Sequence, residues 1–271
     1  MLVYKYGHPD RIDVLADGLI RFTQPAALND PFETLPNLQA VREGLRESAS
    51  QIIEKHGNRG SVESLAAQVS VEPRINEGLA KFQRDTNTKY AFLSLSKKRN
   101  NLLMWSHYAD AHRGFVIGFD SSNAFFKRRE FNVVTPLQEV KYSAIRGIVP
   151  ASALNPLSDH KGVDLAKIFF FTKNRHWSYE EELRMVVNLN TADKIVEVKS
   201  GFDIHLFKFP SESLKEIIFG YQMSKELRLN ITNVVSDKYP NVELFEAKLS
   251  ETEFDLDIRA FTGRRNQAVR S

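Results

Sequence analysis

The spacing of apolar residues changes abruptly along this chain, and that change limits the folds it can adopt. From about residue 38 to residue 85 the apolar residues recur at helical spacing, with an interruption at Gly57–Gly60. Beyond it the period becomes two, with strand-like segments at Tyr90–Ser96 and Gly114–Asp120. The sequence therefore predicts a helical insertion at about 38–85, followed by strands.

The same periodicity, with glycine, proline and asparagine as turn signals, places the other elements. Further strands are expected at Leu2–Tyr6, Gly18–Phe22, Leu137–Tyr142, Leu183–Leu189, Phe202–Phe207, Leu214–Phe219 and Val242–Ala247, and helices around Val14–Leu15, at Asn100–Asp110 and at Ser224–Lys238. Hairpin-like spacing dominates over strand–helix alternation, which favours an α+β fold with a mixed or mainly antiparallel sheet and flanking helices. We predict a single α+β domain over 1–261 and a flexible basic tail at 262–271.

Composition excludes several classes of function. The 271 residues contain no cysteine, which rules out disulfides, thiolate zinc sites, iron–sulfur clusters and a cysteine nucleophile. The net charge of +3 is too small to indicate a nucleic-acid interface by itself. Neither a signal peptide nor an apolar run near the ~20 residues of a spanning helix is present, so we expect a cytoplasmic protein with no membrane partner.

The first segment that could carry chemistry is Phe22–Glu33. Asp30 and Glu33 lie close together in the sequence beside two prolines, and Asn29 precedes them, as a preorganised polar site would require. Alternatively, the segment is an Asx-turn followed by a salt-bridging glutamate.

The second segment is Met104–Tyr108, which we expect on a short helix. Helical spacing places Trp105 and Tyr108 on one face and His107 about a quarter-turn away, so they could form a stacking surface beside a titratable group. Core packing is the alternative for Trp105.

The third segment, Lys173–Arg184, is the most informative. It contains three consecutive acids directly before an apolar strand, where charge must be solvated, paired or used. On an extended backbone Glu180 and Glu182 share one face, about 7 Å apart, with Arg184 in line behind them. Two carboxylates near the aromatic pair Trp177 and Tyr179 suit stabilisation of a cationic, sugar-like transition state or metal binding. A surface charge cluster paired with Arg184 and Lys173 is the alternative.

Common nucleotide, zinc and hydrolase motifs are absent: there is no Gly-x-Gly-x-x-Gly, phosphate loop, His-Glu-x-x-His or Gly-x-Ser-x-Gly. The motifs Asn29–Glu33, Met104–Ala109 and Trp177–Arg184, together with Tyr4–Tyr6, instead resemble a widespread bacterial family catalogued only as a domain of unknown function. The resemblance covers about residues 2–220.

A more distant resemblance is to the ADP-ribosyltransferases. These enzymes open with a strand carrying a basic residue beside an aromatic, here Tyr4, Lys5 and Tyr6, and continue to a turn bearing Ser or Thr, here Thr23. They place a catalytic glutamate at the start of a later strand. By this resemblance Glu182 would bind a ribose hydroxyl and steady the oxocarbenium ion as nicotinamide leaves, and Glu180 would orient the acceptor.

We therefore predict an ADP-ribosyltransferase-like enzyme with NAD as its nucleotide-like substrate and a protein or nucleic acid as acceptor. The resemblance also suggests a stress or phage-defence effector. Expected catalytic residues are Glu182, Glu180 and His107, and expected NAD-binding residues are Tyr4, Lys5, Tyr6, Thr23, Asn29, Trp105, Tyr108, Trp177 and Arg184.

Two other functions remain open at this point. One is a metal-dependent nuclease that holds Mg²⁺ with Asp30, Glu33, Glu180 and Glu182. The other is a non-catalytic module that senses a nucleotide or binds a partner. Magnesium-dependent cleavage of nucleic acid would favour the first, and stabilisation by a nucleotide that is never consumed would favour the second.

Overall fold

The computed structural model describes residues 1–56, 72–127, 135–154 and 165–263. Contacts within the chain divide it into two compact units, which we describe separately. Unit 1 comprises Met1–Phe22, Phe92–Glu139 and Ser178–Ser271, and unit 2 comprises Thr23–Ala91 and Val140–Trp177.

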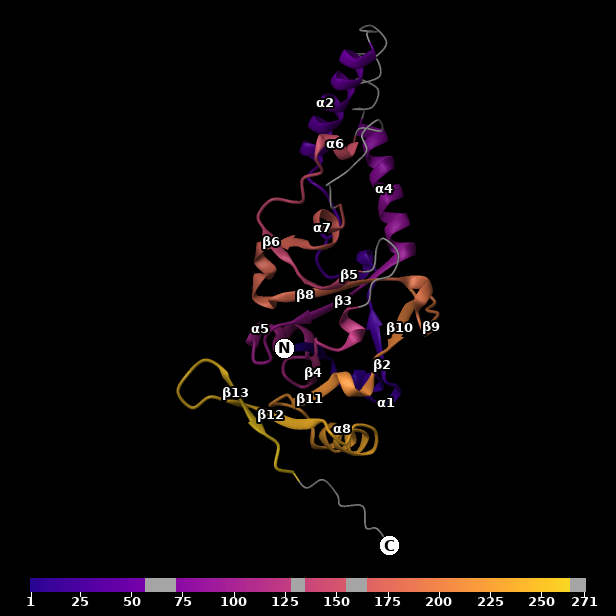
Figure 1. Cartoon of the computed structure of the whole chain (residues 1–271). Helices are drawn as coiled ribbons and strands as arrows, with labels where there is room; N and C mark the ends of the chain where they lie inside the picture. The colour runs from indigo at the N-terminus through magenta and orange to yellow at the C-terminus, as the bar shows by residue number, and fades with distance from the viewer. Residues whose placement is uncertain (57–71, 128–134, 155–164, 264–271) are drawn as a thin grey trace. The chain divides into compact units, whose positions relative to one another are not determined.

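Unit 1 is built on a mixed eight-stranded sheet (Figure 1). Its order is β13-β12-β11-β4-β1-β3-β8-β5, and β11 pairs in parallel with β12 while β4 pairs antiparallel with both β1 and β11. The strands are β1 (Leu2–Gly7), β3 (Tyr90–Ser96), β4 (Phe115–Asp120), β5 (Thr135–Glu139), β8 (Glu182–Asn188), β11 (Leu214–Phe219), β12 (Glu243–Leu249) and β13 (Leu256–Ala260).

Close packing across the central strands requires a glycine at position 118. Gly118 on β4 lies opposite Tyr4 on β1 and opposite Glu216 on β11. A Cβ atom there would lie 2.5 Å from the Glu216 Cγ atom and 3.2 Å from the Tyr4 Cε1 atom. The missing side chain therefore lets the Tyr4 ring and the Glu216 carboxylate pack over the middle of the sheet.

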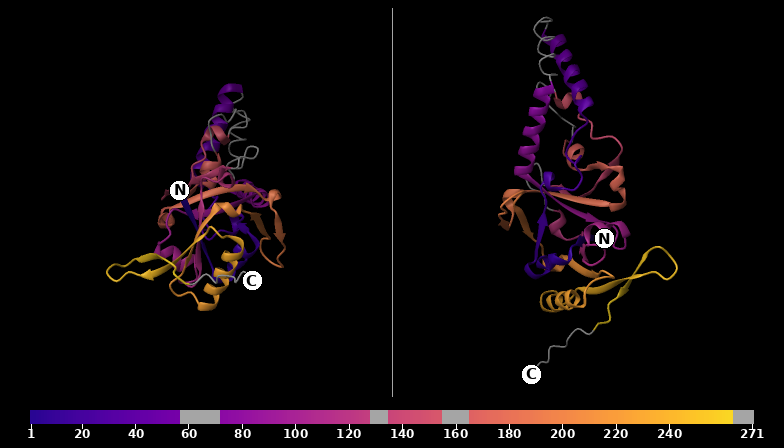
Figure 2. Two further views of the ribbon diagram at one scale, coloured as in Figure 1. Left: turned by 60° about the horizontal axis from the view of Figure 1, so that its bottom comes forward. Right: turned by 180° about the vertical axis from the view of Figure 1, so that it is seen from behind.

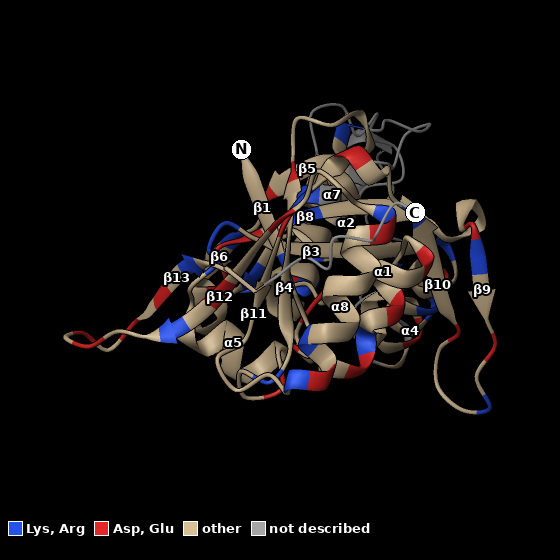
Figure 3. Cartoon of the chain, turned by 90° about the horizontal axis from the view of Figure 1, so that it is seen from below, with Lys and Arg blue, Asp and Glu red and all other residues tan. Residues whose placement is uncertain are grey.

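The rest of unit 1 packs around this sheet. A small sheet has the order β2-β10-β9, and the β12–β13 hairpin extends beyond its neighbours in both views of Figure 2. Lysine, arginine and acidic residues recur along α8 (Figure 3). The remaining elements are α1 (Asp13–Asp17), α5 (Leu102–Tyr108), α8 (Lys225–Lys238), β2 (Leu19–Phe22), β9 (Lys194–Val196), β10 (Ile204–Lys208), and the 3₁₀ helices η1 (Pro9–Ile12), η3 (Ala124–Lys127), η5 (Leu189–Thr191) and η6 (Ser211–Ser213).

Unit 2 is mainly helical. Its elements are η2 (Pro25–Ala27), α2 (Leu38–His56), α4 (Glu72–Lys89), α6 (Ala151–Leu154), α7 (Leu165–Phe170), and the parallel pair β6 (Lys141–Ser143) and β7 (Thr172–Asn174). Helix α2 packs closely on α6, because a Cβ at Gly44 would meet the Leu154 Cδ1 atom at 2.9 Å. The Ser48 hydroxyl donates a hydrogen bond to the Ala151 carbonyl oxygen at 2.8 Å.

The α+β class and the mixed sheet are confirmed, and β3, β11 and α8 lie where the periodicity places them. Several expected strands have other bounds; for example, Phe202–Phe207 is observed as Ile204–Lys208 and Val242–Ala247 as Glu243–Leu249. Leu137–Tyr142 is divided between β5 and β6, which belong to different sheets, and the strand expected from Leu183 begins at Glu182. Within the expected insertion the structure describes α2 and α4, whereas Gly57–Gly60 lies outside the described residues.

The single-domain boundary at residue 261 stays a prediction, and residues 264–271 of the expected tail also lie outside the described part of the chain. No helix among the described residues is long and apolar enough to cross a membrane.

Candidate functional site

The expected site residues divide between the two units. Unit 1 holds Glu180, Glu182, Arg184, His107, Tyr108, Trp105, Tyr4, Lys5 and Tyr6, and unit 2 holds Thr23, Asn29 and Trp177. We therefore build the site in unit 1 first.

The backbone leading to the two glutamates is not extended, contrary to the sequence-based prediction. Glu180 is the last residue of the 3₁₀ helix η4 (Arg175–Glu180), and Glu181 has a φ of 42°, in the left-handed region that non-glycine residues rarely adopt. Strand β8 begins only at Glu182. The expected alternation of Glu180 and Glu182 on one strand was wrong, although both side chains are buried and Glu181 is not.

Glu182 forms a buried ion pair with Arg184. The Arg184 Nε atom donates to the Glu182 Oε1 atom at 2.7 Å, and its second nitrogen donates to Oε2 at 3.0 Å. Both side chains are at most 2% exposed, and the guanidinium carbon lies 5.0 Å from the centre of the Phe92 ring. This bidentate geometry fixes the carboxylate and compensates its charge.

Glu180 has a different partner. The Tyr108 hydroxyl donates to the Glu180 Oε1 atom at 2.5 Å. Asn101 holds the two segments together, because its side-chain oxygen accepts from the Met104 N–H at the start of α5 and its Nδ2 atom donates to the Tyr179 carbonyl oxygen at 2.7 Å. The structure thus brings Tyr108 and Glu180, two of the expected site residues, into direct contact.

Lys5 lies close enough to this cluster to share its electrostatics. Its Nζ atom donates to the Ser94 carbonyl oxygen at 3.0 Å. Burial lowers the pKa of Lys5 to about 8. The Glu182 and Glu180 carboxylates act in the opposite direction and offset part of this decrease. Two cations, Lys5 and Arg184, therefore face two buried carboxylates.

His107 is the exposed member of the group. Its ring centre lies 6.1 Å from that of Tyr179 and 6.4 Å from that of Tyr108. These rings form an accessible aromatic surface beside the buried glutamates. Asn101 was not among the expected site residues, although an asparagine directly before an apolar helical run is a recognisable N-cap signal.

Three expected ligand contacts are core residues instead. Trp105 is 0% exposed, its Nε1 atom donates to the Arg99 carbonyl oxygen at 3.0 Å, and its ring stacks on His112. Tyr6 is buried against the edge of Trp105, and its hydroxyl donates to the Lys98 carbonyl oxygen. Their aromatic surfaces are already covered by protein, so Trp105 does not offer the expected stacking surface.

Tyr4 is also buried, on the same sheet face as Tyr6. Burial, followed by the nearby Glu216 carboxylate, raises the pKa of Tyr4 to about 12. Arg99 forms an ion pair with that glutamate at 3.2 Å. The Tyr4 side chain therefore belongs to a second, internal polar group and not to the Glu180–Glu182 cluster.

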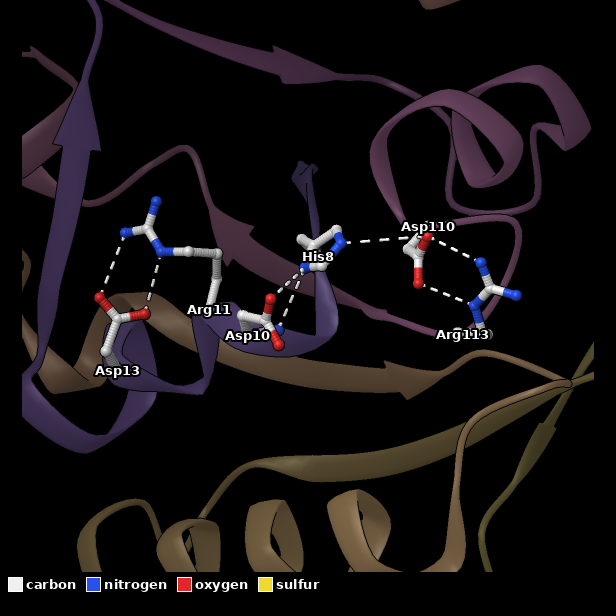
Figure 4. Close-up of polar contacts among 6 residues, drawn as sticks. All are labelled: His8, Asp10, Arg11, Asp13, Asp110 and Arg113. Carbon is white, nitrogen blue, oxygen red and sulfur yellow. Dashed lines mark hydrogen bonds and ion pairs between the residues drawn. The ribbon is translucent and has the colours of Figure 1, made fainter. Parts of the chain in front are cut away.

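The turn that follows α5 carries a surface ion-pair group, shown in Figure 4. Arg113 donates twice to Asp110, at 2.7 and 2.9 Å, and the His8 Nε2 atom lies 3.9 Å from the same carboxylate. The hydrogen bonds from Arg113 lower the pKa of Asp110. Such exposed pairs contribute little to stability, and we assign them no role in the site.

The remaining expected site residues, Thr23, Asn29 and Trp177, belong to unit 2. Thr23 is half-buried and Asn29 is exposed, while Trp177 is half-buried with the Lys173 Nζ atom 4.9 Å from its ring centre. Lys173 forms a buried ion pair with Glu33 at 3.3 Å.

Among the described residues no group of three or more histidine, aspartate or glutamate side chains is placed to hold a metal ion. Of the carboxylates that the nuclease hypothesis requires, Asp30 and Glu33 belong to unit 2, and Glu180 and Glu182 belong to unit 1.

Comparison with known proteins gives one match. Residues 104–185 match the model of a family described as protein of unknown function (DUF2971). The matched range includes the Met104–Tyr108 and Trp177–Arg184 motifs but not Asn29–Glu33, so it is narrower than the range of about 2–220 that the motifs suggested. No curated protein and no solved structure matches the chain.

Proposed function

We propose that the Glu180–Glu182 cluster of unit 1 is the site of an ADP-ribosyltransferase-like enzyme that cleaves the nicotinamide–ribose bond of NAD. The observation that carries the proposal is the pair of buried carboxylates with different partners, Arg184 on Glu182 and Tyr108 on Glu180. Carboxylates held in different environments are suited to different roles in one reaction.

Glu182 is suited to electrostatic stabilisation. Its carboxylate is held by two hydrogen bonds from Arg184 and is almost completely shielded from water. Because Arg184 already holds this carboxylate in place, it can interact with a positive charge that develops nearby at little reorganisation cost. In the proposed reaction the bond between ribose C1′ and the nicotinamide ring nitrogen breaks, the electron pair leaves with neutral nicotinamide, and the ribose becomes an oxocarbenium ion.

Glu180 is suited to proton transfer. Its carboxylate accepts from a neutral phenol, that of Tyr108, whereas Glu182 accepts from the guanidinium of Arg184. In the second half of the reaction the acceptor hydroxyl or amine attacks C1′, and its proton passes to Glu180. The exposed ring of His107 and the partly buried ring of Tyr179 supply the aromatic surface for nicotinamide that Trp105 does not supply.

Nicotinamide release from NAD tests this proposal. Purified protein is incubated with NAD and a cell lysate that supplies acceptors, and free nicotinamide is measured by chromatography. We expect Glu182→Gln to reduce release at least 100-fold, because one lost electrostatic contact to a developing charge costs that order of rate. Glu181→Gln is the matched control, since it removes the neighbouring carboxylate, which is 43% exposed.

A folding control accompanies this test, because Glu182→Gln also weakens the pair with Arg184. Glu180→Gln keeps an oxygen that can accept from Tyr108 and removes only the proposed proton acceptor. Loss of release in Glu180→Gln with an unchanged unfolding midpoint supports the proposal. Equal release from wild type, Glu180→Gln and Glu182→Gln contradicts it.

A binding role without turnover is the second candidate. It is favoured by the completeness of the Glu182–Arg184 pair, which already satisfies both oxygens of the Glu182 carboxylate. If NAD raises the unfolding temperature but no nicotinamide is released, the cluster acts as a nucleotide-sensing site.

A further inference from the structure

Unit 2 contains a cavity of about 260 Å³ that the proposed function does not use. Its lining combines buried charged residues with exposed apolar ones. The lining includes the charged residues Asp30, Glu33, Arg146 and Lys173 and the apolar residues Phe32 and Ile145.

Asp30 is the unusual member of this lining. Asp30 is only 4% exposed. Its Oδ1 atom accepts a hydrogen bond from the Phe32 N–H at 2.9 Å, as in an Asx-turn. Its Oδ2 atom is buried and has no hydrogen-bond partner among the residues that the structure describes. A buried acceptor without a donor costs about 1–3 kcal/mol, so it indicates a place where a ligand could donate a hydrogen bond.

The charges around Asp30 restrict the class of ligand. Glu33 and Lys173 compensate each other in a buried ion pair at 3.3 Å. Arg146 is an exposed residue of the lining, and with it the formal charges of Asp30, Glu33, Arg146 and Lys173 sum to zero. The cavity is therefore formally neutral, which favours a neutral hydrogen-bond donor over an ammonium ion or a phosphate.

The apolar part of the lining indicates the shape of the ligand. Phe32 is 54% exposed and Ile145 is 59% exposed, although both line the cavity. Large apolar side chains left exposed around a polar group are typical of small-molecule sites, where they cover a flat hydrophobic body. The volume is below that of a drug-sized site and suits a single ring system.

From these observations we propose that the unit 2 cavity binds an amino-substituted nucleobase, whose exocyclic amine donates to the Asp30 Oδ2 atom and whose ring packs against Phe32 and Ile145. The proposal does not depend on NAD cleavage in unit 1.

Calorimetry with a matched pair of nucleosides tests the proposal. Adenosine and purine riboside differ only in the exocyclic amine. We expect the full-length protein to bind adenosine, or its pyrimidine counterpart cytidine, and to bind purine riboside at least tenfold more weakly than adenosine. Absence of binding by both adenosine and cytidine, or equal affinity for adenosine and purine riboside, overturns the proposal.

Asp30→Asn provides an independent test at the protein. The asparagine keeps the oxygen that accepts from Phe32 N–H but replaces the unpartnered acceptor with an N–H donor. Affinity for the amino-nucleoside should fall at least tenfold, whereas Asp85→Asn, which changes an exposed carboxylate of the same unit away from the cavity, should leave it unchanged. Wild-type affinity in Asp30→Asn contradicts the proposal, and if this variant does not fold, the nucleoside pair decides. Binding should persist in Glu182→Gln, which separates this test from that of the unit 1 site.

Discussion

Replacing Arg184 by methionine should destabilise the protein strongly. Arg184 is 0% exposed and is the bidentate partner of Glu182, which is 3% exposed. The variant leaves a buried carboxylate without its cation, and such breaks cost about 3–5 kcal/mol. At about 2–4 °C per kcal/mol for a chain of this size, the unfolding temperature should fall by roughly 10 °C.

The double variant Glu182→Leu with Arg184→Met should recover most of this loss. It replaces the ion pair by apolar side chains that can pack on Phe92, so no buried charge remains uncompensated at these two positions. We expect the double variant to lie within about 2 kcal/mol of wild type, and the two single variants to be non-additive by at least that amount.

Urea unfolding followed by circular dichroism measures these free energies for wild type, both single variants and the double variant. A cost below about 1 kcal/mol for Arg184→Met would show that water or Lys5 compensates Glu182, and additive single variants would show that the two side chains do not interact. Either result would refute the reasoning from the buried pair.

Two other variants test the same cluster. Tyr108→Phe removes the donor to the buried Glu180 carboxylate and should cost about 1–3 kcal/mol by urea unfolding, with Tyr90→Phe as the control elsewhere; equal costs would count against the contact. For Lys5, the folded pKa of about 8 lies below the ordinary 10.5, so below pH 8 both states are protonated and the burial cost is complete. Between pH 8 and 10.5 the unfolded state binds more protons, so stability should rise with pH, by at most about 1.4 kcal/mol per unit. Unfolding titrations from pH 7 to 9.5 should show this rise in wild type and not in Lys5→Met, and identical pH profiles would contradict it.

The regular part of unit 1 follows from local sequence patterns. The alternating apolar residues Ala91, Leu93 and Leu95 predict β3, and all three are buried, as is Phe92 between them. Ser224 caps α8 by accepting from the Leu227 N–H. The short strand β9 has three exposed residues and no alternation of burial, so its pairing with β10 depends on tertiary contacts that a local pattern does not contain.

The site was predictable in its residue types but not in its geometry. Three acids before an apolar strand indicated Glu180 and Glu182, but the left-handed conformation of Glu181 has no sequence signal comparable to a glycine. Helix periodicity predicts which side chains share a face of α5, but it does not predict which other residues pack on that face. Trp105 was therefore assigned to a ligand surface, whereas in the structure its ring stacks on His112, which lies beyond the end of the helix. The distinction between Asp30 and Glu33 likewise depends on Lys173, far away in the sequence.

The most direct test of the central claim is whether wild-type protein binds NAD and releases nicotinamide from it. Calorimetry with NAD and chromatography of the same sample after incubation with acceptor lysate measure both quantities. The proposed chemistry at Glu180 and Glu182 predicts saturable binding and release of nicotinamide that depends on enzyme concentration. Absence of both binding and release would contradict it.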